Sequence, residues 1–186
     1  ETGEWIWEVK FDGYRLLARI DGDDVRLFTR NSHDWSARMK DLVAAIRALD
    51  LPSGWLDGEI VVQGEHGTPD FQLLQNAFDA SRTESIQYFF FDLPFFAGHD
   101  LRAVPLNERR ALLRQLLDAA PAGGPLHFSE DFAASAKDLL HTACELRLEG
   151  IIGKRADSTY STRRSPAWIK PKCTKRQEFV IGGYTD

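Results

Sequence analysis

The chain has few cysteines and no long apolar run. Only two of its 186 residues are cysteines, Cys144 and Cys173, so the sequence predicts neither a disulfide framework nor a cysteine-rich metal site. No stretch approaches the roughly 20 apolar residues that span a bilayer. A basic-then-apolar signal segment is also missing from the start. These absences lead us to expect a cytoplasmic protein that has no membrane partner.

Two common nucleotide-binding signatures are missing as well. The sequence contains neither the G-x-x-x-x-G-K-[ST] phosphate loop nor the G-x-G-x-x-G fingerprint of dinucleotide-binding folds. Its five histidines form no close pair of the kind that binds zinc. Any nucleotide chemistry in this chain is therefore expected to use other residues.

Charge is unevenly distributed along the chain. The net charge of −5 argues against a nucleic-acid partner if it is taken as a whole. Residues 147–176, however, contain nine Lys or Arg residues and only two acidic ones, a net charge of +7. Such a concentration of positive potential suits a polyphosphate partner. The alternative is a solvated charged face.

Hydrophobic patterning predicts a mixed α+β chain. Alternating apolar positions indicate strands, and positions repeating every three or four residues indicate amphipathic helices. Because many connections are short, we expect mostly antiparallel strands. Thr68 and Asn107 are the expected caps of two helices. The expected strands are residues 5–9, 14–20, 25–29, 55–62 with a break at 57–59, 86–93, 150–155, 168–172 and 178–182, and the expected helices are 37–49, 69–80, 108–119 and 134–148.

Residues 8–15 place several reactive side chains at a break between two strands. Gly13 allows a sharp bend because it has no Cβ. Lys10 lies beside that bend and Arg15 follows it, an arrangement that suits covalent chemistry on a phosphorylated substrate. The alternative is a hairpin connection whose charges are solvated.

Other charged side chains occur inside apolar strands, where they are costly unless they are paired or bound. They supply candidate parts of a nucleotidyl-transfer site: phosphate-neutralising lysines, a metal-binding carboxylate and an aromatic ring for a base. The ordinary alternatives are salt bridges, a turn, an exposed strand edge and core packing. Because side chains alternate along a strand, the two members of each of three pairs share a face of their own strand. The pairs are Lys170 with Lys172, Asp57 with Glu59, and Phe89 with Phe91.

Six stretches, taken in order, resemble the motifs of the covalent nucleotidyltransferases, which comprise DNA and RNA ligases and mRNA capping enzymes. The first resembles the K-x-D-G-x-R motif, and the series spans nearly the whole chain. The stretches are KFDGYR at 10–15, LFTRN at 27–31, WLDGE at 55–59, FFFD at 89–92, EGIIGK at 149–154 and WIKPK at 168–172.

Three further stretches resemble the ATP-dependent ligase domain of the bacterial end-joining DNA ligase D enzymes. They are TRNSHDW at 29–35, DFQLLQN at 70–76 and PLNERR at 105–110. The resemblance implies an ATP-grasp-like DNA ligase core of α+β class, with antiparallel sheets and flanking helices. It implies an adenylation domain at residues 1–176, and residues 177–186 would begin a C-terminal OB-fold domain.

The resemblance also implies substrates and partners. ATP would be used with Mg²⁺ or Mn²⁺, and AMP would be the covalent intermediate. The nucleic-acid substrate would be nicked or broken duplex DNA, repaired by non-homologous end joining. A DNA-end-binding repair protein is a further expected partner, and the expected location is the bacterial cytoplasm, associated with the nucleoid.

Site roles follow from the same resemblance. Lys10 would attack the α-phosphorus of ATP and carry AMP. The remaining implied contacts are Glu8 with the adenine amine, Val9 and Ile151 lining the base pocket, Phe91 stacking on adenine with Phe89 as the alternative, Arg15 and Glu59 with the sugar, Arg30 with sugar or DNA, Glu149 and Glu59 with metal, and Lys170 and Lys172 with the α-phosphate.

Two alternatives remain open from the sequence. An RNA ligase or a capping-type nucleotidyltransferase shares the same lysine chemistry. A DNA-end-binding module with a degenerate transferase site is the second alternative. We expect this chain to bind ATP, or to carry AMP, but to seal DNA poorly without the OB-fold domain.

Overall fold

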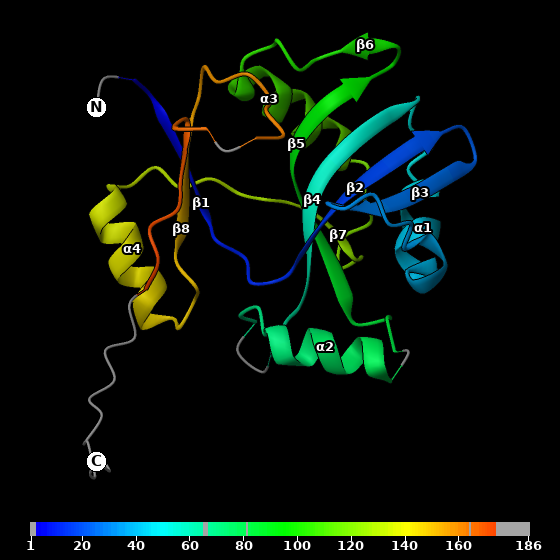
Figure 1. Cartoon of the computed structure of the whole chain (residues 1–186), viewed down its shortest axis with the longest axis horizontal. Helices are drawn as coiled ribbons and strands as arrows, with labels where there is room; N and C mark the ends of the chain where they lie inside the picture. Colours follow the sequence, from blue (N-terminus) through cyan, green and yellow to red (C-terminus); the bar gives the residue numbers. More distant parts are fainter. Residues whose placement is uncertain (1–2, 65–66, 81, 164, 174–186) are drawn as a thin grey trace, which may run out of the picture.

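The computed structural model describes residues 3–64, 67–80, 82–163 and 165–173. Within these residues the chain forms a six-stranded sheet, a three-stranded sheet and four α-helices (Figure 1). This architecture agrees with the α+β class predicted from the sequence.

The six-stranded sheet has the strand order β3-β2-β4-β5-β6, and β7 pairs with β5. All of these pairings are antiparallel except β5 with β7. The strands are β2 (Tyr14–Asp21), β3 (Asp24–Thr29), β4 (Gly54–Val62), β5 (Ile86–Phe96), β6 (His99–Asp100) and β7 (Leu126–Phe128).

The three-stranded sheet contains β1 (Trp5–Val9), β8 (Ile151–Arg155) and β9 (Trp168–Ile169), in the order β1-β8-β9. Both of its pairings are antiparallel. The chain leaves this sheet after β1, forms the larger sheet, and returns after β7. Residues 10–13 are the first connection between the two sheets.

The helices lie on the two sheets separately (Figure 1). Figure 1 shows α1 beside β3, α2 across the lower ends of β4 and β5, and α3 behind β5, whereas α4 runs along β8. A 3₁₀ helix at Ser36–Arg38 precedes α1. The helices are α1 (Lys40–Arg47), α2 (Phe71–Asp79), α3 (Leu106–Leu117) and α4 (Ala136–Glu145).

The main hydrophobic core lies between the large sheet and its helices. Leu16, Leu56, Ile60 and Phe90 come from its central strands and are fully buried. Tyr88 is equally buried, and its hydroxyl donates a hydrogen bond to the carbonyl of Leu16 (2.7 Å). This satisfied hydroxyl ties β5 to β2 inside the core.

Two predicted helix caps are wrong. Helix α2 is capped by Asp70, whose carboxylate accepts from the Leu73 amide (3.1 Å), and not by Thr68. Helix α3 begins at Leu106 after Pro105, and the Asn107 side chain accepts from the adjacent Glu108 amide. In both places a neighbouring residue supplies the extended backbone that precedes the helix.

The predicted break at residues 57–59 is absorbed within a continuous β4. The strand continues through this segment, and its register against β5 shifts between Asp57 and Gly58. The short strands β6 and β7 were not predicted, and the strand predicted at 168–172 is confirmed at Trp168–Ile169 only. The predicted strand at 178–182 and the predicted start of an OB-fold domain lie outside the described residues.

The two cysteines are joined. A disulfide links Cys144, in α4, to Cys173, 29 residues further along. The small number of cysteines predicted no disulfide framework, and their spacing gave no sign of this bond. Among the described residues no helix is both long enough and apolar enough to cross a membrane.

Candidate active site

The KFDGYR segment connects β1 to β2 and so joins the two sheets. The Lys10 amide donates to the carbonyl of Gly150 (3.0 Å), which fixes the start of the connection against the residue preceding β8. Gly13 lies so close to β4 that an added Cβ would be 2.1 Å from the carbonyl oxygen of Ile60. Its amide donates to Glu59 Oε1 (3.2 Å). Glycine is therefore required at this position by the close approach of the neighbouring strand.

Glu149 connects two of the predicted site lysines. Its Oε2 atom pairs with Lys10 Nζ, and its Oε1 atom pairs with Lys172 Nζ at 2.8 Å. Partial burial would raise the pKa of Glu149, but the hydrogen bonds from the two lysines outweigh it and the pKa is lowered. Gly150 lets β8 begin here: its φ is +151°, and a Cβ would lie 2.2 Å from the Pro171 carbonyl oxygen.

Arg15 is held by a carboxylate and a phenol from distant parts of the chain. Its guanidinium donates two hydrogen bonds to the fully buried Asp57, one of them from Nε at 2.9 Å. The Tyr160 hydroxyl donates to the same carboxylate at 2.8 Å. Burial would lower the pKa of Arg15, but the bonds to Asp57 outweigh it and raise the pKa. Arg15 is thus a fixed positive charge.

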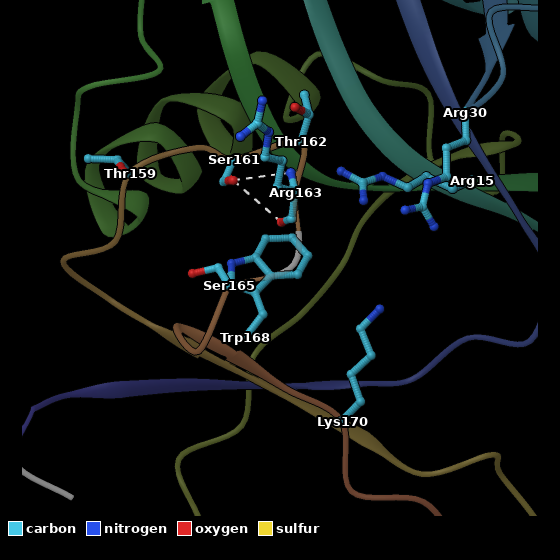
Figure 2. A pocket seen from close by; sticks show the side chains of 9 residues that line it. All are labelled: Arg15, Arg30, Thr159, Ser161, Thr162, Arg163, Ser165, Trp168 and Lys170. Atoms are coloured by element: carbon cyan, nitrogen blue, oxygen red, sulfur yellow. Dashed lines mark hydrogen bonds between the residues drawn. The ribbon is translucent and has the colours of Figure 1, made fainter.

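A cavity of about 400 Å³ lies beside Arg15 (Figure 2). Figure 2 shows the Lys170 ammonium extending toward the guanidinium groups of Arg15 and Arg30. Burial and the positive charges of Lys10 and Arg15 lower the pKa of Lys170. Such mutual repulsion is relieved by a bound anion. The lining residues are Arg15, Arg30, Thr159, Ser161, Thr162, Arg163, Ser165, Trp168 and Lys170.

Glu59 has an unusual environment for a carboxyl group. Burial raises its pKa from 4.5 to about 7, although Lys10 and the Gly13 amide favour the ionised form. Near neutral pH the side chain is therefore divided between an acceptor-only carboxylate and a carboxyl group that can also donate.

The two candidate stacking rings have different neighbours. Phe91 is 7% exposed and packs edge-on to Trp168, with ring centroids 5.9 Å apart. Lys154 Nζ lies 4.3 Å from the Phe91 centroid. Phe89 instead stacks between Phe11 and His127, at 4.5 and 4.7 Å. Both faces of Phe89 are therefore occupied by other rings.

The three remaining base-pocket candidates meet along β1 and β8. Val9 and Ile151 lie directly opposite each other in the antiparallel register. Glu8 is 2% exposed and does not line the cavity. Its carboxylate instead contacts Lys154, Arg110 and Ser129. The structure thus brings Lys10, Glu149 and Lys172 together, gathers Arg15, Arg30 and Lys170 around the cavity, and sets Glu8 in a separate buried network.

Several residues that support these side chains were not predicted. Asp57 was noticed as a charge within a strand, but its partner Tyr160 lies 103 residues away. Arg110 was noticed only as part of the PLNERR stretch. Two adjacent arginines in an otherwise amphipathic helix were the available signal, because a buried arginine needs a partner. Lys154 and Trp168 were present in recognised motifs without an assigned role.

The carboxylates of this site suit a metal ion only if phosphate oxygens of a bound nucleotide supply further ligands. Within the described part of the chain there is no cluster of three or more His, Cys, Asp or Glu side chains. Glu149 and Glu59 both interact with Lys10 and offer the oxygen ligands that Mg²⁺ prefers. Since Mg²⁺ commonly uses one or two carboxylates together with substrate phosphates, this donor set suits a metal that arrives with a nucleotide.

An amine paired with a carboxylate, beside a cavity lined with cations, is an arrangement that suits nucleotidyl transfer. Residues 1–172 match the family model described as the ATP dependent DNA ligase domain. The chain belongs to this family.

Curated relatives agree with this assignment. The chain is 55% identical over 184 residues to the "Multifunctional non-homologous end joining protein LigD" of Pseudomonas aeruginosa, covering 99% of this chain and 22% of that protein. It is 35% identical over 187 residues to the "Multifunctional non-homologous end joining DNA repair protein LigD" of Mycobacterium tuberculosis, covering 99% of this chain and 24% of that protein. The chain thus spans less than a quarter of the length of these relatives.

Solved structures share the fold. The ligase domain of M. tuberculosis LigD matches with a TM-score of 0.78 and 32% identity, over 90% of this chain and 54% of that chain. A mycobacterial DNA ligase D complexed with ATP and MES matches with a TM-score of 0.77 and 31% identity, with the same coverage. The predicted fold of a DNA ligase nucleotidyltransferase core is therefore confirmed.

Proposed function

We propose that this chain is the catalytic core of an ATP-dependent DNA ligase that acts in double-strand break repair by end joining. The observation that carries the proposal is the placement of Lys10. Its amine pairs with Glu149 next to Lys172, and it lies close enough to Lys170 to lower that lysine's pKa. A nucleophile surrounded by cations suits attack on a phosphorus atom whose oxygens carry negative charge.

In the first step, Lys10 Nζ bonds to the α-phosphorus of ATP while the bond from that phosphorus to the pyrophosphate oxygen breaks. The amine loses a proton, pyrophosphate leaves, and AMP remains as a lysine phosphoramidate. Because a protonated ammonium has no lone pair, Lys10 has to give up a proton before it attacks. The ion pair between Lys10 and Glu149 has to break as part of this activation, because a paired carboxylate stabilises the protonated ammonium over the neutral amine.

Other residues bind the nucleotide. Glu8 contacts the adenine amine, Val9 and Ile151 line the base pocket, and Phe91 stacks on the ring. Arg15 and Glu59 contact the sugar, while Arg30 reaches sugar or DNA. Lys170 and Lys172 contact the α-phosphate. Support for these roles comes from the motif order in the sequence, from the cationic cavity, and from the pairing of Val9 with Ile151.

Two carboxylates near Lys10, Glu149 and Glu59, would hold a divalent ion for the first step. Mg²⁺ or Mn²⁺ would be held by Glu149, with Glu59 nearby, and would neutralise charge on the phosphates. Glu149 pairs with one lysine through each of its oxygens, so the ion would share this carboxylate with Lys10 and Lys172 or take the place of one of them.

The later steps need DNA and further protein. AMP is transferred from Lys10 to a DNA 5′-phosphate, and a 3′-hydroxyl then displaces AMP to join the strand. We propose nicked or broken duplex DNA as the substrate, an OB-fold domain following residue 176, and a DNA-end-binding repair protein as a partner. The bacterial cytoplasm, at the nucleoid, is the proposed location.

The proposal is tested by measuring the intact mass of the chain after incubation with ATP and Mg²⁺. We expect one added AMP, absent from Lys10→Ala and retained in Lys137→Ala, a variant of an exposed lysine in α4. Absence of the adduct from the unaltered chain under all metal conditions would contradict the proposal and favour a DNA-end-binding module. An adduct formed from GTP in preference to ATP would favour a capping-type enzyme, and sealing of RNA nicks alone would favour an RNA ligase.

A further inference from the structure

A buried ionic network surrounds Glu8 and reaches the cavity through Lys154, which lies over the ring of the cavity-lining Trp168. Glu8, Arg110, Ser129 and Lys154 are each at most 3% exposed. Arg110 Nη1 donates to Glu8 Oε1 at 2.9 Å, and Lys154 Nζ lies 2.6 Å from the same oxygen in an ion pair that lacks hydrogen-bond geometry. The Ser129 hydroxyl donates to Glu8 Oε2 at 2.6 Å. Three distant segments thus converge on one carboxylate.

The two oxygens of Glu8 are not equally occupied. Both cations face Oε1, whereas Oε2 has one partner within the described part of the chain, the Ser129 hydroxyl. Each carboxylate oxygen has two acceptor sites. Oε2 therefore keeps one acceptor site available for a further donor. A carboxylate held between two cations accepts hydrogen bonds and donates none.

Arg110 contacts two of the residues to which base recognition is assigned, Glu8 and Phe91. Besides the Glu8 carboxylate, its guanidinium donates to the backbone carbonyl of Phe91 (3.3 Å). It is held in place by the Ser129 carbonyl (2.8 Å) and the Asp131 carboxylate (3.1 Å). A single rigid guanidinium on α3 therefore fixes a side chain of β1 relative to the backbone of β5.

Lys154, in β8, also contacts both Glu8 and Phe91. Its ammonium lies over the rings of Phe91 and Trp168, 4.3 and 4.5 Å from their centroids. Burial lowers the pKa of Lys154, while the Glu8 charge opposes this change. The Glu8 carboxylate and the Phe91 ring thus share the Lys154 ammonium, while the Arg110 guanidinium joins Glu8 to the Phe91 backbone.

We propose that Arg110 is a positioning residue that makes the nucleotide reaction selective for a purine with an amine at ring position 6. Through Arg110, the acceptor-only Glu8 carboxylate is held at a fixed place relative to the Phe91 ring. Adenine presents an amine that can donate to the remaining acceptor site of Oε2. Guanine presents a carbonyl oxygen at the same ring position, which a carboxylate repels. This inference rests on the proposed function, in which Glu8 and Phe91 contact the base.

The test compares two nucleotides that differ only in the amine. ATP and purine riboside triphosphate, which lacks the exocyclic amine, are each used to form the AMP-type adduct on the chain. In Arg110→Lys the charge remains, but one ammonium cannot span Glu8, Phe91 and Ser129 together. We expect the preference for ATP, expressed as the ratio of kcat/KM values, to fall about tenfold, mostly through a higher KM for ATP.

Arg109→Lys is the matched control. Arg109 precedes Arg110 in α3, is equally buried, and donates two bonds to Asp92 at 2.7 and 3.0 Å without contacting Glu8. A purely structural loss lowers the stability of both variants and leaves the nucleotide preference unchanged. An equal preference in Arg110→Lys, Arg109→Lys and the unaltered chain would therefore overturn the inference.

Ser129→Ala provides a second test if Arg110→Lys does not fold. This variant removes the hydroxyl that holds Oε2, the oxygen assigned to the adenine amine. We expect a lower preference for ATP over purine riboside triphosphate, and an unchanged preference overturns the inference. Failure of the proposed function has a different signature, because the unaltered chain then forms no adduct with either nucleotide.

Discussion

Glu59 is a half-buried carboxyl group whose surroundings raise its pKa to about 7. Its neighbours Lys10 and Gly13 belong to the nucleophile connection, so its charge is felt where the first bond forms. Lys10, Glu149 and Lys172 could be predicted as site residues because each lies in a motif with a recognisable order. The surroundings of Glu8 could not, because its partners Arg110 and Ser129 are 102 and 121 residues away, and no local pattern encodes such pairings.

The raised pKa of Glu59 predicts a pH effect on stability. Between pH 4.5 and about 7 the folded chain binds a proton that the unfolded chain releases, so this group's contribution to stability falls as the pH rises through that range. We expect Glu59→Gln to gain about 2–3 kcal/mol of stability, relative to the unaltered chain, between about pH 5 and pH 8. Urea unfolding followed by tryptophan fluorescence measures the difference.

Glu108→Gln serves as the control for this experiment because Glu108 is exposed at the start of α3. Its stability relative to the unaltered chain should not change with pH. A constant difference between Glu59→Gln and the unaltered chain at the two pH values would mean that Glu59 is ionised throughout this range.

At the scale of elements, every strand of five or more residues was predicted, whereas of the short strands only β9 was. β1 and β2 were predicted within a residue of their bounds because their apolar residues alternate and a glycine bend separates them. β7 is three residues long and pairs in parallel with β5, a contact that local patterning cannot reveal. The cap of α2 was misplaced because Thr68 and Asp70 are both good capping residues. The disulfide was missed because two isolated cysteines carry no spacing information.

The disulfide makes a prediction at this scale. The Cys144–Cys173 bond closes a loop that contains β8, β9 and both Glu149 and Lys170. A loop of this length lowers the entropy of the unfolded chain enough to stabilise the fold by about 3–4 kcal/mol. We expect dithiothreitol to lower the free energy of unfolding by about this amount, as measured by urea denaturation.

The double variant Cys144→Ser, Cys173→Ser is the control, and it should be indifferent to dithiothreitol. An equal effect of the reductant on this variant would show that the disulfide is not the cause. In a reducing cytoplasm the bond would be open, so adduct formation should be measured in both redox states.

At the scale of the whole molecule, the charge of the cavity is opposite in sign to the net charge of the chain. The chain carries a net charge of −5, yet three arginines and a lysine line the cavity in Figure 2. The sequence predicted this asymmetry from residues 147–176. The resemblance implied one nucleotide site for Arg15, Arg30 and Lys170, but it did not predict that Arg163 would join them at the cavity, because Arg163 belongs to none of the recognised motifs.

This cavity predicts salt-dependent DNA binding. If Arg30 contacts a DNA phosphate, Arg30→Ala should lower the slope of log K against log salt by about 0.9, and the loss of affinity should not depend on DNA sequence. Fluorescence anisotropy of a labelled nicked duplex over a series of KCl concentrations measures the slope.

Arg114→Ala is the matched control, since Arg114 is exposed and already paired with Glu130. This variant should keep the slope of the unaltered chain. Equal slopes for Arg30→Ala and the unaltered chain would assign Arg30 to the nucleotide sugar and not to DNA.

The crossing of the chain between its two sheets has a mechanical consequence. Lys10 and Glu149 are joined to each other at the ends of neighbouring strands of the small sheet, whereas Arg15 and Glu59 belong to the large one. If one sheet turned relative to the other, the nucleophile and its carboxylate would travel together as one body. The spacing of Lys10 from Arg15 would change instead, with residues 11–13 acting as the pivot. The distance between the attacking amine and the nucleotide sugar would then depend on the angle between the two sheets.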